Sequence, residues 1–524
     1  MRNIFFLILP FLWSCVIAQK QDVQTKYADL ITEEATYAHL EKLATEEMEG
    51  RGTGQPGIKK AAQYIAQEFE KYGLSAPVEG SYFQEISFIE KKLTADKFEI
   101  DHKAFSYGKD FYIQTQSNFS DFNADEIVFV GYGIQDETYN DLQNLDIEGK
   151  AVLLINEGEP IAPNGDFLLS GSNTPSEWGR SRFKKIQELL KLNPKIILSY
   201  DSRNKSLLDE DREEFHRSQI SLAENNTAQV KKATEQAPII HLSEEAANHI
   251  LSGANTTLEK VTKEINSTGK PQSQVVKASL TAELGVKEEE FTNPNVLGYL
   301  EGSEKKDEVL IITAHYDHEG IINGEIYFGA DDNASGTSGI LNLAKSFSEA
   351  KKAGDGPKRS ILFIAFVAEE KGLLGSKYYV ENPVIPLQKS IVNINMDMIG
   401  RIDDLHLDKS PNYIHTIGAK RSSGELYEIN ETANKKYTQL DIDYTYDKDE
   451  EPLQLFKRSD QYSFYQKNIP IIFYFSGLHP HYHTPEDTID KIDFPMTVKR
   501  TKLVFHTAWE IANRDKKLEN NLLK

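Results

Sequence analysis

Short apolar runs recur through the second half of the chain, and segments with a helical repeat separate them. The runs resemble strands buried on both faces of a sheet, and they lie at 309–314, 360–368, 390–396 and 470–475. Helical patterns lie between or after them, at 337–350, 373–380 and 497–513. This repeated alternation of strand and helix predicts an α/β domain whose sheet is covered on both faces.

The first half of the chain is organised differently. A helix is predicted at 58–69, where apolar residues recur with the spacing of one buried helical face. Further on, short apolar runs and one amphipathic helix indicate a compact β-rich unit over roughly 116–275. Because 524 residues exceed what one core usually fills, we predict an α/β domain made of 19–115 and 276–524 that this unit interrupts.

The N-terminal residues have the pattern of an export signal. Arg2 precedes an apolar run at 4–17, and Val16-Ile17-Ala18 fits a signal-peptidase site. We therefore predict that residues 1–18 are removed and that the protein is secreted or periplasmic. Lipid attachment at Cys15 is the alternative, but Trp13 is bulky where such a site favours small residues.

Composition excludes several classes of function. The formal net charge of −22 lacks the basic excess that nucleic-acid binding requires. The N-terminal apolar run is too short to span a bilayer and no later segment approaches that length, so stable membrane insertion is not expected. Cys15 is the only cysteine, so the cleaved protein would hold a metal through His, Asp and Glu alone. The oligomeric state stays open.

Histidines and carboxylates follow several of the predicted strands or lie in the loops after them. These clusters are 315–317, 331–332, 369–370, 397 and 479–483. A single residue of this kind is more often a helix cap or a solvated loop residue. Because the carboxyl ends of parallel strands converge on one crevice, their repetition from strand to strand indicates a metal site.

Imidazole and carboxylate donors without thiolates suit a pair of catalytic zinc ions. Two ions about 3.5 Å apart can share one carboxylate and take two further ligands each. The five residues that suffice are His315, Asp332, Glu370, Asp397 and His483. Glu369 stands beside Glu370 and can act as the base for the attacking water.

Five segments resemble the zinc-dependent aminopeptidase family, which also includes glutamate carboxypeptidases, the transferrin receptor and glutaminyl cyclases. They are 314–317, 329–336, 368–376, 395–400 and 482–488, in the order that the family has. The resemblance covers about 295–493. It implies a mixed, largely parallel sheet sandwiched by helices, interrupted by a β-rich protease-associated domain, and an enzyme that acts on peptides.

The same resemblance assigns roles to the metal ligands. One zinc would be held by His315 and Asp397. The other would be held by Glu370 and His483. Asp332 would bridge the two ions, with the neighbouring Asp331 as the competing choice. Cobalt or manganese could replace zinc in a site of these ligands.

Catalytic roles also follow from the resemblance. Glu369 would be the general base, and Asp317 would orient His315 by accepting its other N–H. Tyr482 would donate to the carbonyl oxygen as negative charge develops, and a packing tyrosine is the alternative there. Gln461 and Ser463 replace a histidine and a proline that are common in the family, which leaves the roles around them open.

The predicted activity is removal of N-terminal residues from peptides by a di-zinc enzyme. A carboxypeptidase or dipeptidase is the nearest rival, and Arg458 or Arg401 could then bind the substrate carboxylate. A non-catalytic receptor-like protein and a one-zinc glutaminyl cyclase are disfavoured, because all five ligands are present. The acidic run at 441–451 is interpreted as a solvated loop, and His479 and His481 as surface or loop residues.

Overall fold

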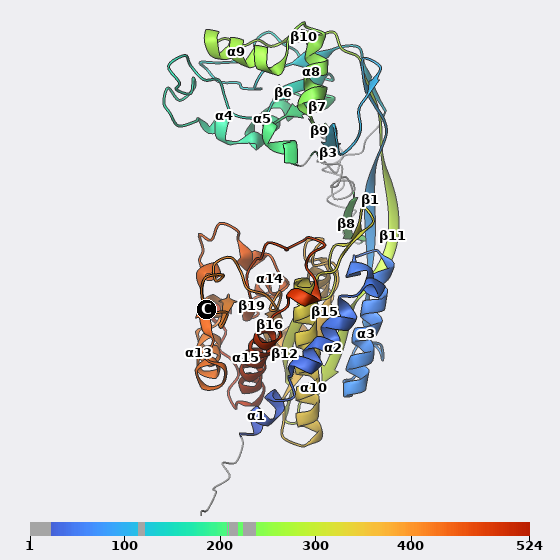
Figure 1. Ribbon diagram of the computed structural model, residues 1–524, viewed down its shortest axis with the longest axis vertical. Helices are drawn as coiled ribbons and strands as arrows, with labels where there is room; N and C mark the ends of the chain where they lie inside the picture. Colours follow the sequence, from blue (N-terminus) through green and yellow to red (C-terminus); the bar gives the residue numbers. More distant parts are fainter. Residues whose placement is uncertain (1–21, 114–120, 207, 209–217, 224–236, 524) are drawn as a thin grey trace, which may run out of the picture.

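The computed structural model describes residues 22–113, 121–206, 208, 218–223 and 237–523. The predicted signal segment at 1–18, Cys15 included, lies outside the described residues. The chain forms two bodies joined by a long two-stranded arm, as Figure 1 shows. In the part of the chain that the structure describes, no helix has the length and apolar character needed to cross a membrane.

The main body is built on a mixed sheet of eleven strands among the described residues. Its main path runs β18 (Asp441–Asp443), β17 (Tyr413–Ile417), β19 (Ile471–Phe475), β16 (Ser390–Met396), β12 (Lys305–His315), β15 (Arg359–Phe366), β11 (Leu280–Leu300), β1 (Phe83–Ile100) and β2 (Lys103–Ala104). β19, β16, β12 and β15 are parallel, whereas β17 and β11 run antiparallel beside them. The predicted α/β class is confirmed.

Alternate side chains of the parallel strands enter two separate cores, because successive residues of a strand point to opposite faces. On β12, Leu310 and Ile312 pack with the helices of one face, and Val309 and Ile311 pack with those of the other. The first face is covered by α2 (Glu33–Leu43), α3 (Pro56–Tyr72), α10 (Gly336–Lys352) and α15 (Phe494–Asn513). The second is covered by α11 (Leu374–Glu381) and α14 (Gln461–Tyr465).

The helix predicted at 58–69 corresponds to α3. Pro56 occupies its first turn, where the missing N–H costs no intrahelical hydrogen bond. Gly73 ends it with a φ of 86°, a left-handed conformation that glycine adopts without steric penalty. Ile58, Ile65 and Phe69 are fully buried on its inner face, as their spacing predicts.

The arm is formed by β1 and β11, which pair antiparallel from Phe83↔Val296 to Ile100↔Leu280. It carries the inserted body, whose second sheet has the order β10 (Gln274–Val276), β5 (Ile127–Phe129), β6 (Ala151–Ile155), β7 (Ile196–Tyr200), β9 (Ile239–Leu242) and β3 (Phe111–Ile113). β3 precedes the boundary expected at residue 116. The helices α5 (Arg182–Leu190), α8 (Glu244–Ser252) and α9 (Leu258–Thr268) belong to the same body (Figure 1).

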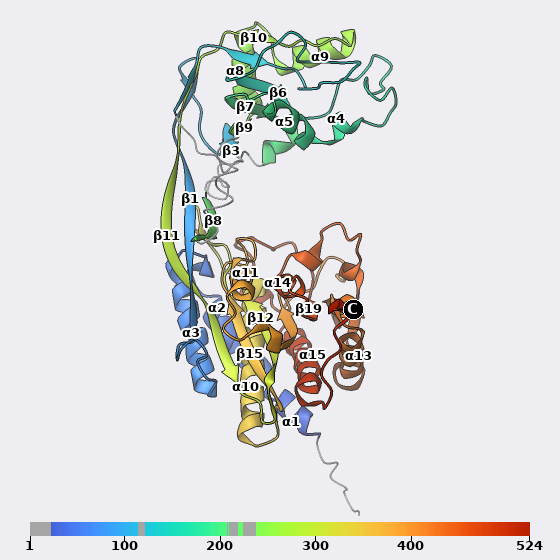
Figure 2. The same cartoon turned by 180° about the vertical axis from the view of Figure 1, so that it is seen from behind.

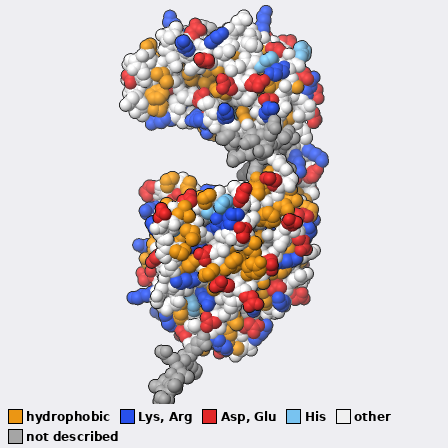
Figure 3. Space-filling model, in the orientation of Figure 1, with side chains coloured by type: hydrophobic (Ala, Val, Ile, Leu, Met, Phe, Trp, Pro, Cys, Tyr) orange, Lys and Arg blue, Asp and Glu red, His pale blue; other side chains and the backbone are white. Residues whose placement is uncertain are grey.

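The arm fixes which edge of the main sheet faces the inserted body. β11 runs from the inserted body into the main sheet, and β15 beside it runs in the opposite direction (Figure 2). The carboxyl ends of β15, and of β12 and β16 parallel to it, therefore lie on the edge toward the inserted body. Figure 3 shows open space between the two bodies on one side of the arm.

Arg359 anchors the segment after α15 to the main sheet, and its replacement tests that anchor. Its side chain is fully buried, donates to the Glu308 carboxylate at 2.7 Å, and also donates to the carbonyls of Ile511, Arg514 and Lys516. We expect Arg359→Met to destabilise the main body by about 2–4 kcal/mol, because several buried carbonyls lose their donor. Thermal denaturation would measure the loss.

The neighbouring Lys358 offers a matched control, since its side chain is 33% exposed and forms ion pairs with Glu304 and Asp515. Lys358→Met should leave the melting temperature almost unchanged. Equal melting temperatures for the two variants would contradict the anchoring role of Arg359.

Candidate metal centre

Three neighbouring strands deliver the candidate ligands to one edge of the main sheet. His315 is the last residue of β12, Asp397 follows the end of β16, and Glu370 lies in the loop after β15. Asp332 lies in the short segment η5 (Ala330–Ser335) before α10, and His483 lies in the loop after β19. The five residues that the sequence assigned as ligands are thus brought together.

Asp332 lies between the two histidines. Its Oδ1 is 3.4 Å from Nε2 of His315, and its Oδ2 is 3.1 Å from Nε2 of His483. Asp397 Oδ1 lies 3.2 Å from the first imidazole, and Glu370 Oε2 lies 3.1 Å from the second. The group is therefore two clusters of one histidine and one carboxylate with a shared carboxylate between them.

Asp331 points elsewhere. Its Oδ1 accepts the backbone N–H of Gly400 at 2.6 Å, and its Oδ2 lies 3.4 Å from Nε2 of His479. Asp332, and not Asp331, has both carboxylate oxygens directed at the histidines of the site. His479 lies in the loop after β19, as one of its two interpretations expected, but its side chain is fully buried and is not part of the surface.

The donor atoms fit divalent zinc. Zinc bonds of about 2.0–2.1 Å at tetrahedral angles place ligand atoms roughly 3.3 Å apart, and the four contacts around Asp332 measure 3.1–3.4 Å. The buried Nε2 of His483 makes no hydrogen bond, although two carboxylate oxygens lie within 3.1 Å. Nitrogen and carboxylate oxygens without any thiolate are a ligand set that zinc accepts.

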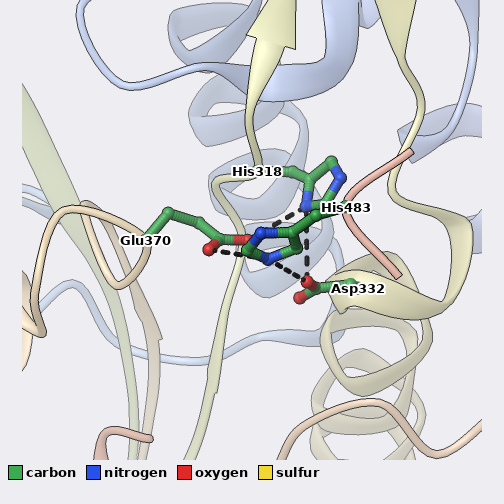
Figure 4. A group of neighbouring side chains, drawn as sticks. All are labelled: His318, Asp332, Glu370 and His483. Carbon is green, nitrogen blue, oxygen red and sulfur yellow. Dashed lines mark hydrogen bonds and ion pairs between the residues drawn. The ribbon is translucent and has the colours of Figure 1, made fainter. Parts of the chain in front are cut away.

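His318 is a further member of the site that the sequence reasoning missed. Its Nδ1 lies 3.0 Å from Oε1 of Glu370 and 3.6 Å from Oδ2 of Asp332. Figure 4 shows His318, Asp332, Glu370 and His483 converging from separate segments. It lies three residues after the end of β12, and no strand-end pattern marked it because its partners come from distant segments.

The pKa values of the adjacent residues Glu369 and Glu370 are shifted in opposite directions. Burial raises the pKa of the Glu369 carboxyl well above its ordinary value, and the carboxylates of Glu370 and Asp397 add to the rise. Burial also acts to raise the pKa of Glu370, but the imidazoles of His483 and His318 outweigh it and hold that pKa well below the usual range. Such a divergence separates a proton carrier from a carboxylate that stays ionised.

Asp317 supports the site through its backbone as well as its side chain. The His315 Nδ1 lies 3.1 Å from the carbonyl oxygen of Asp317, whereas the Asp317 carboxylate is 3.7 Å away. That carboxylate instead accepts the Glu369 N–H at 3.1 Å and the Thr53 hydroxyl at 3.0 Å. The residue expected to orient His315 is in place, but its carbonyl lies at hydrogen-bond distance and its side chain positions Glu369.

Tyr482 lines a cavity of about 390 Å³ beside the metal ligands. Its ring stacks on that of His483 with centroids 3.8 Å apart, and its hydroxyl accepts from Nη2 of Arg458 at 3.4 Å. Burial raises the pKa of Tyr482 well above the ordinary phenol value. The hydroxyl is therefore a proton-bearing donor at neutral pH.

The two departures from the family pattern are accommodated by hydrogen bonds. The side-chain oxygen of Gln461 accepts from Asn395 at 3.0 Å, and its nitrogen donates to the carbonyl of Phe456 at 3.1 Å. The Ser463 hydroxyl lies 2.9 Å from that of Ser376. In the same segment Ser459 donates to Oδ2 of Asp397 at 2.6 Å, which fixes the orientation of that ligand.

Arg51 holds the backbone that carries the ligands, a role that the sequence did not indicate. The fully buried guanidinium donates to the carbonyls of Tyr316, Leu43, Phe328 and Gly329 at 2.8 Å each. It thereby ties the end of β12 to the segment that presents Asp332. Burial lowers the pKa of Arg51 to about 10, so it remains a cation at neutral pH.

The second half of the chain is similar to known peptidases. Residues 295–508 match the model of Peptidase family M28. Aminopeptidase YwaD of Bacillus subtilis is 30% identical over 236 residues, which are 43% of this chain and 46% of that protein. A glutamate carboxypeptidase 2 homolog of Caenorhabditis elegans is 36% identical over 125 residues, which are 24% of this chain and 15% of that protein. The chain thus matches less than half the length of these relatives.

Solved structures are similar over nearly the whole chain. The aminopeptidase from Aneurinibacillus sp. strain AM-1 has a TM-score of 0.57 at 20% identity, covering 95% of this chain and 97% of that one. The zinc aminopeptidase BSAP of Bacillus subtilis has a TM-score of 0.55 at 19% identity, covering 93% of this chain and 97% of that one. These likenesses establish the fold, and the family match confirms the resemblance stated from the motifs.

Replacing Arg51 by lysine tests whether the guanidinium positions the metal ligands. Lys keeps the charge but cannot reach four carbonyls at once, so the segment presenting Asp332 should loosen. We expect Arg51→Lys to weaken metal binding about 10- to 100-fold, as for other residues that orient ligands. Titration of the metal-free protein with zinc would measure the change.

Arg203→Lys is a matched control, because that arginine lies in the inserted body with a half-exposed side chain. It should bind zinc as the unmodified protein does. Unchanged zinc affinity in Arg51→Lys would show that the carbonyl contacts do not set the ligand geometry.

Proposed function

We propose that the chain is an exported di-zinc exopeptidase that removes N-terminal residues from peptides. The observation that carries the proposal is the placement of Asp332 between His315 and His483, with one further carboxylate at each side. Two similar half-sites with a shared carboxylate fit a pair of ions better than one. The family match over 295–508 and the aminopeptidases among the relatives support the same reading.

In this proposal His315 and Asp397 hold one ion. Glu370 and His483 hold the other, and Asp332 holds both. His318 steadies Glu370 through the contact at its Oε1. When bound, zinc would supply Lewis acidity that activates water and polarises the scissile carbonyl.

Glu369 carries the proton in the proposed reaction. Its raised pKa suits a carboxyl that accepts a proton from the attacking water and passes it to the leaving amine. Its backbone is held by the Asp317 carboxylate, so the side chain keeps a defined position beside the ligands. The Tyr482 hydroxyl lines the same cavity and can donate to the substrate carbonyl oxygen as charge develops.

The lining of the cavity supports binding of a substrate peptide by one terminus, with an apolar side chain at that terminus. Its apolar lining is formed by Leu373, Met398, Leu455, Phe473, Phe475 and Leu478. The carboxylates that line it are all at the metal centre: Asp332, Glu369, Glu370 and Asp397. We propose that the inserted body, a protease-associated-like unit over about 116–275, limits access of folded proteins to this edge of the main sheet.

One observation favours the rival carboxypeptidase or dipeptidase activity. Three cationic side chains, Lys377, Lys457 and Arg458, line the same cavity and could bind a substrate carboxylate. Arg401 does not line it, and instead contacts His481 and Asp487. A non-catalytic receptor-like role is disfavoured, because the chain has all five proposed ligands and Glu369.

Replacing Glu369 by glutamine tests the proposed base. We expect Glu369→Gln to reduce kcat at least about 100-fold, because general acid–base catalysis contributes that much or more. Zinc content should stay near two ions per chain, since Glu369 is not a proposed ligand. Glu381→Gln, on the exposed end of α11, is the matched control and should keep full activity. Full activity in Glu369→Gln would exclude this residue as the base.

Digestion of a mixed peptide library decides between the two exopeptidase activities. We expect products shortened at the N-terminus, and no products after removal of metal by a chelator. Arg458→Gln should then leave the choice of terminus unchanged. Shortening at the C-terminus, together with a raised KM in Arg458→Gln, would establish the carboxypeptidase instead.

A further inference from the structure

A second group of histidines and carboxylates lies at the edge of the main sheet opposite the arm. His415 is in β17, Asp443 is in the edge strand β18, and Asp403 and His406 are in the loop that precedes β17. None of them is among the proposed zinc ligands. Asp443 belongs to the acidic run that the sequence indicated as a solvated loop, and that interpretation was wrong for this residue.

Asp403 contacts both imidazoles and leaves one nitrogen of each available. Its Oδ1 lies 2.6 Å from Nδ1 of His406, and its Oδ2 lies 2.7 Å from Nε2 of His415. A neutral imidazole that donates through one nitrogen presents a lone pair at the other. A carboxylate that fixes the tautomer in this way is the usual outer partner of a metal-binding histidine.

The two remaining nitrogens face the carboxylate of Asp443. Nε2 of His406 lies 3.6 Å from its Oδ2, and Nδ1 of His415 lies 3.6 Å from its Oδ1. Both distances exceed a hydrogen bond. Nδ1 of His415 has no hydrogen-bond partner although the side chain is fully buried. A buried polar atom in this position is costly unless something binds it.

We propose that His406, His415 and Asp443 form a third metal site, which takes zinc or a similar divalent ion. Two imidazoles and one carboxylate are a ligand set that zinc uses, with water completing the coordination. The Asp443 side chain is 25% exposed, so an ion and a water can enter from solvent. The other three side chains are almost fully buried, which makes the site preorganised on the protein side.

The site would brace the loops that carry two catalytic ligands. The Asp403 N–H donates to the Tyr413 hydroxyl at 2.7 Å, and that hydroxyl donates to the Ser476 carbonyl at 2.6 Å. A Cβ on the next residue, Gly477, would collide with the Asp403 carboxylate. Asp403 therefore couples the loop after Asp397 to the loop that leads to His483, and the third ion would stiffen that connection.

The rival explanation is a metal-free network in which the imidazoles are protonated. Burial lowers the pKa of His415, but the carboxylates of Asp403 and Asp443 outweigh burial and raise it. Asp403 is flanked by both imidazoles, and Asp443 also accepts from the Thr445 N–H at 2.6 Å. In that case the residues would contribute to stability without binding an ion.

Metal counting separates the two explanations and does not depend on peptidase activity. A double variant, Asp332→Asn with His483→Gln, removes ligands of the proposed catalytic zinc pair. We expect it to retain one tightly bound zinc per chain by mass spectrometry, and to develop the visible absorption of low-symmetry Co²⁺ when cobalt is added. Addition of Asp443→Asn should remove this ion or weaken it at least about 100-fold.

Matched variants complete the experiment. Asp441→Asn alters an exposed carboxylate of the same strand and should leave the ion bound. Asp403→Asn should weaken binding about 10- to 100-fold, as expected for an outer carboxylate. No ion in the double variant, or equal binding with and without Asp443→Asn, would overturn the proposal. The number of ions lost on introducing Asp332→Asn and His483→Gln alone tests the proposed catalytic zinc pair. It does not affect the test of the third site, which depends on adding Asp443→Asn.

Discussion

The structure depends on a concentration of buried carboxylates that cannot coexist without positive charge. Asp332, Glu369, Glu370 and Asp397 lie within one small region, and burial raises the pKa of Asp332 well above its ordinary value. Like charges in a poorly solvated region repel strongly. The histidines offset part of this repulsion, but they do so only if protonated, which removes them as ligands. The proposed pair of divalent cations would satisfy both requirements at once, because divalent cations neutralise carboxylates and accept imidazole lone pairs.

The surrounding chain separates polar atoms that need a cation from those that do not. Asp487 accepts the backbone N–H groups of Asp331 and Asp332, and Asp317 accepts that of Glu369. These carboxylates are satisfied by the protein and hold the backbone in place. Nε2 of His483 has no such partner, although two carboxylate oxygens lie within 3.1 Å of it. An unpaired, buried nitrogen that faces two carboxylate oxygens fits a ligand position for His483 without reference to any family motif.

The features of the site that depend on strand and helix periodicity were predictable from the sequence. His315 and Asp397 were predictable because each lies at or just after the end of an apolar run, and parallel strand ends must share an edge of the sheet. Arg51 was not predictable in this way. It lies about 265 positions before the carbonyl of Tyr316 that it binds, and its role exists only once α2, β12 and the Asp332 segment have come together. His318 and Asp443 were missed for the same reason, since their partners come from distant segments.

The proposed edge site is a second place in the sheet where buried carboxylates and imidazoles face one another and a cation would stabilise them. The Asp317 carbonyl lies at hydrogen-bond distance from His315 at the metal centre, and the Asp403 carboxylate contacts both imidazoles at the edge site. At both places imidazole nitrogens face another carboxylate. The two places are connected through Asp403, Tyr413 and Ser476. The loop with His483 would then be held from both of its ends, by the proposed zinc pair at one end and by the proposed ion at the β17–β18 edge at the other. Such bracing matters for a loop ligand, because a loop has no regular hydrogen-bond ladder to hold it.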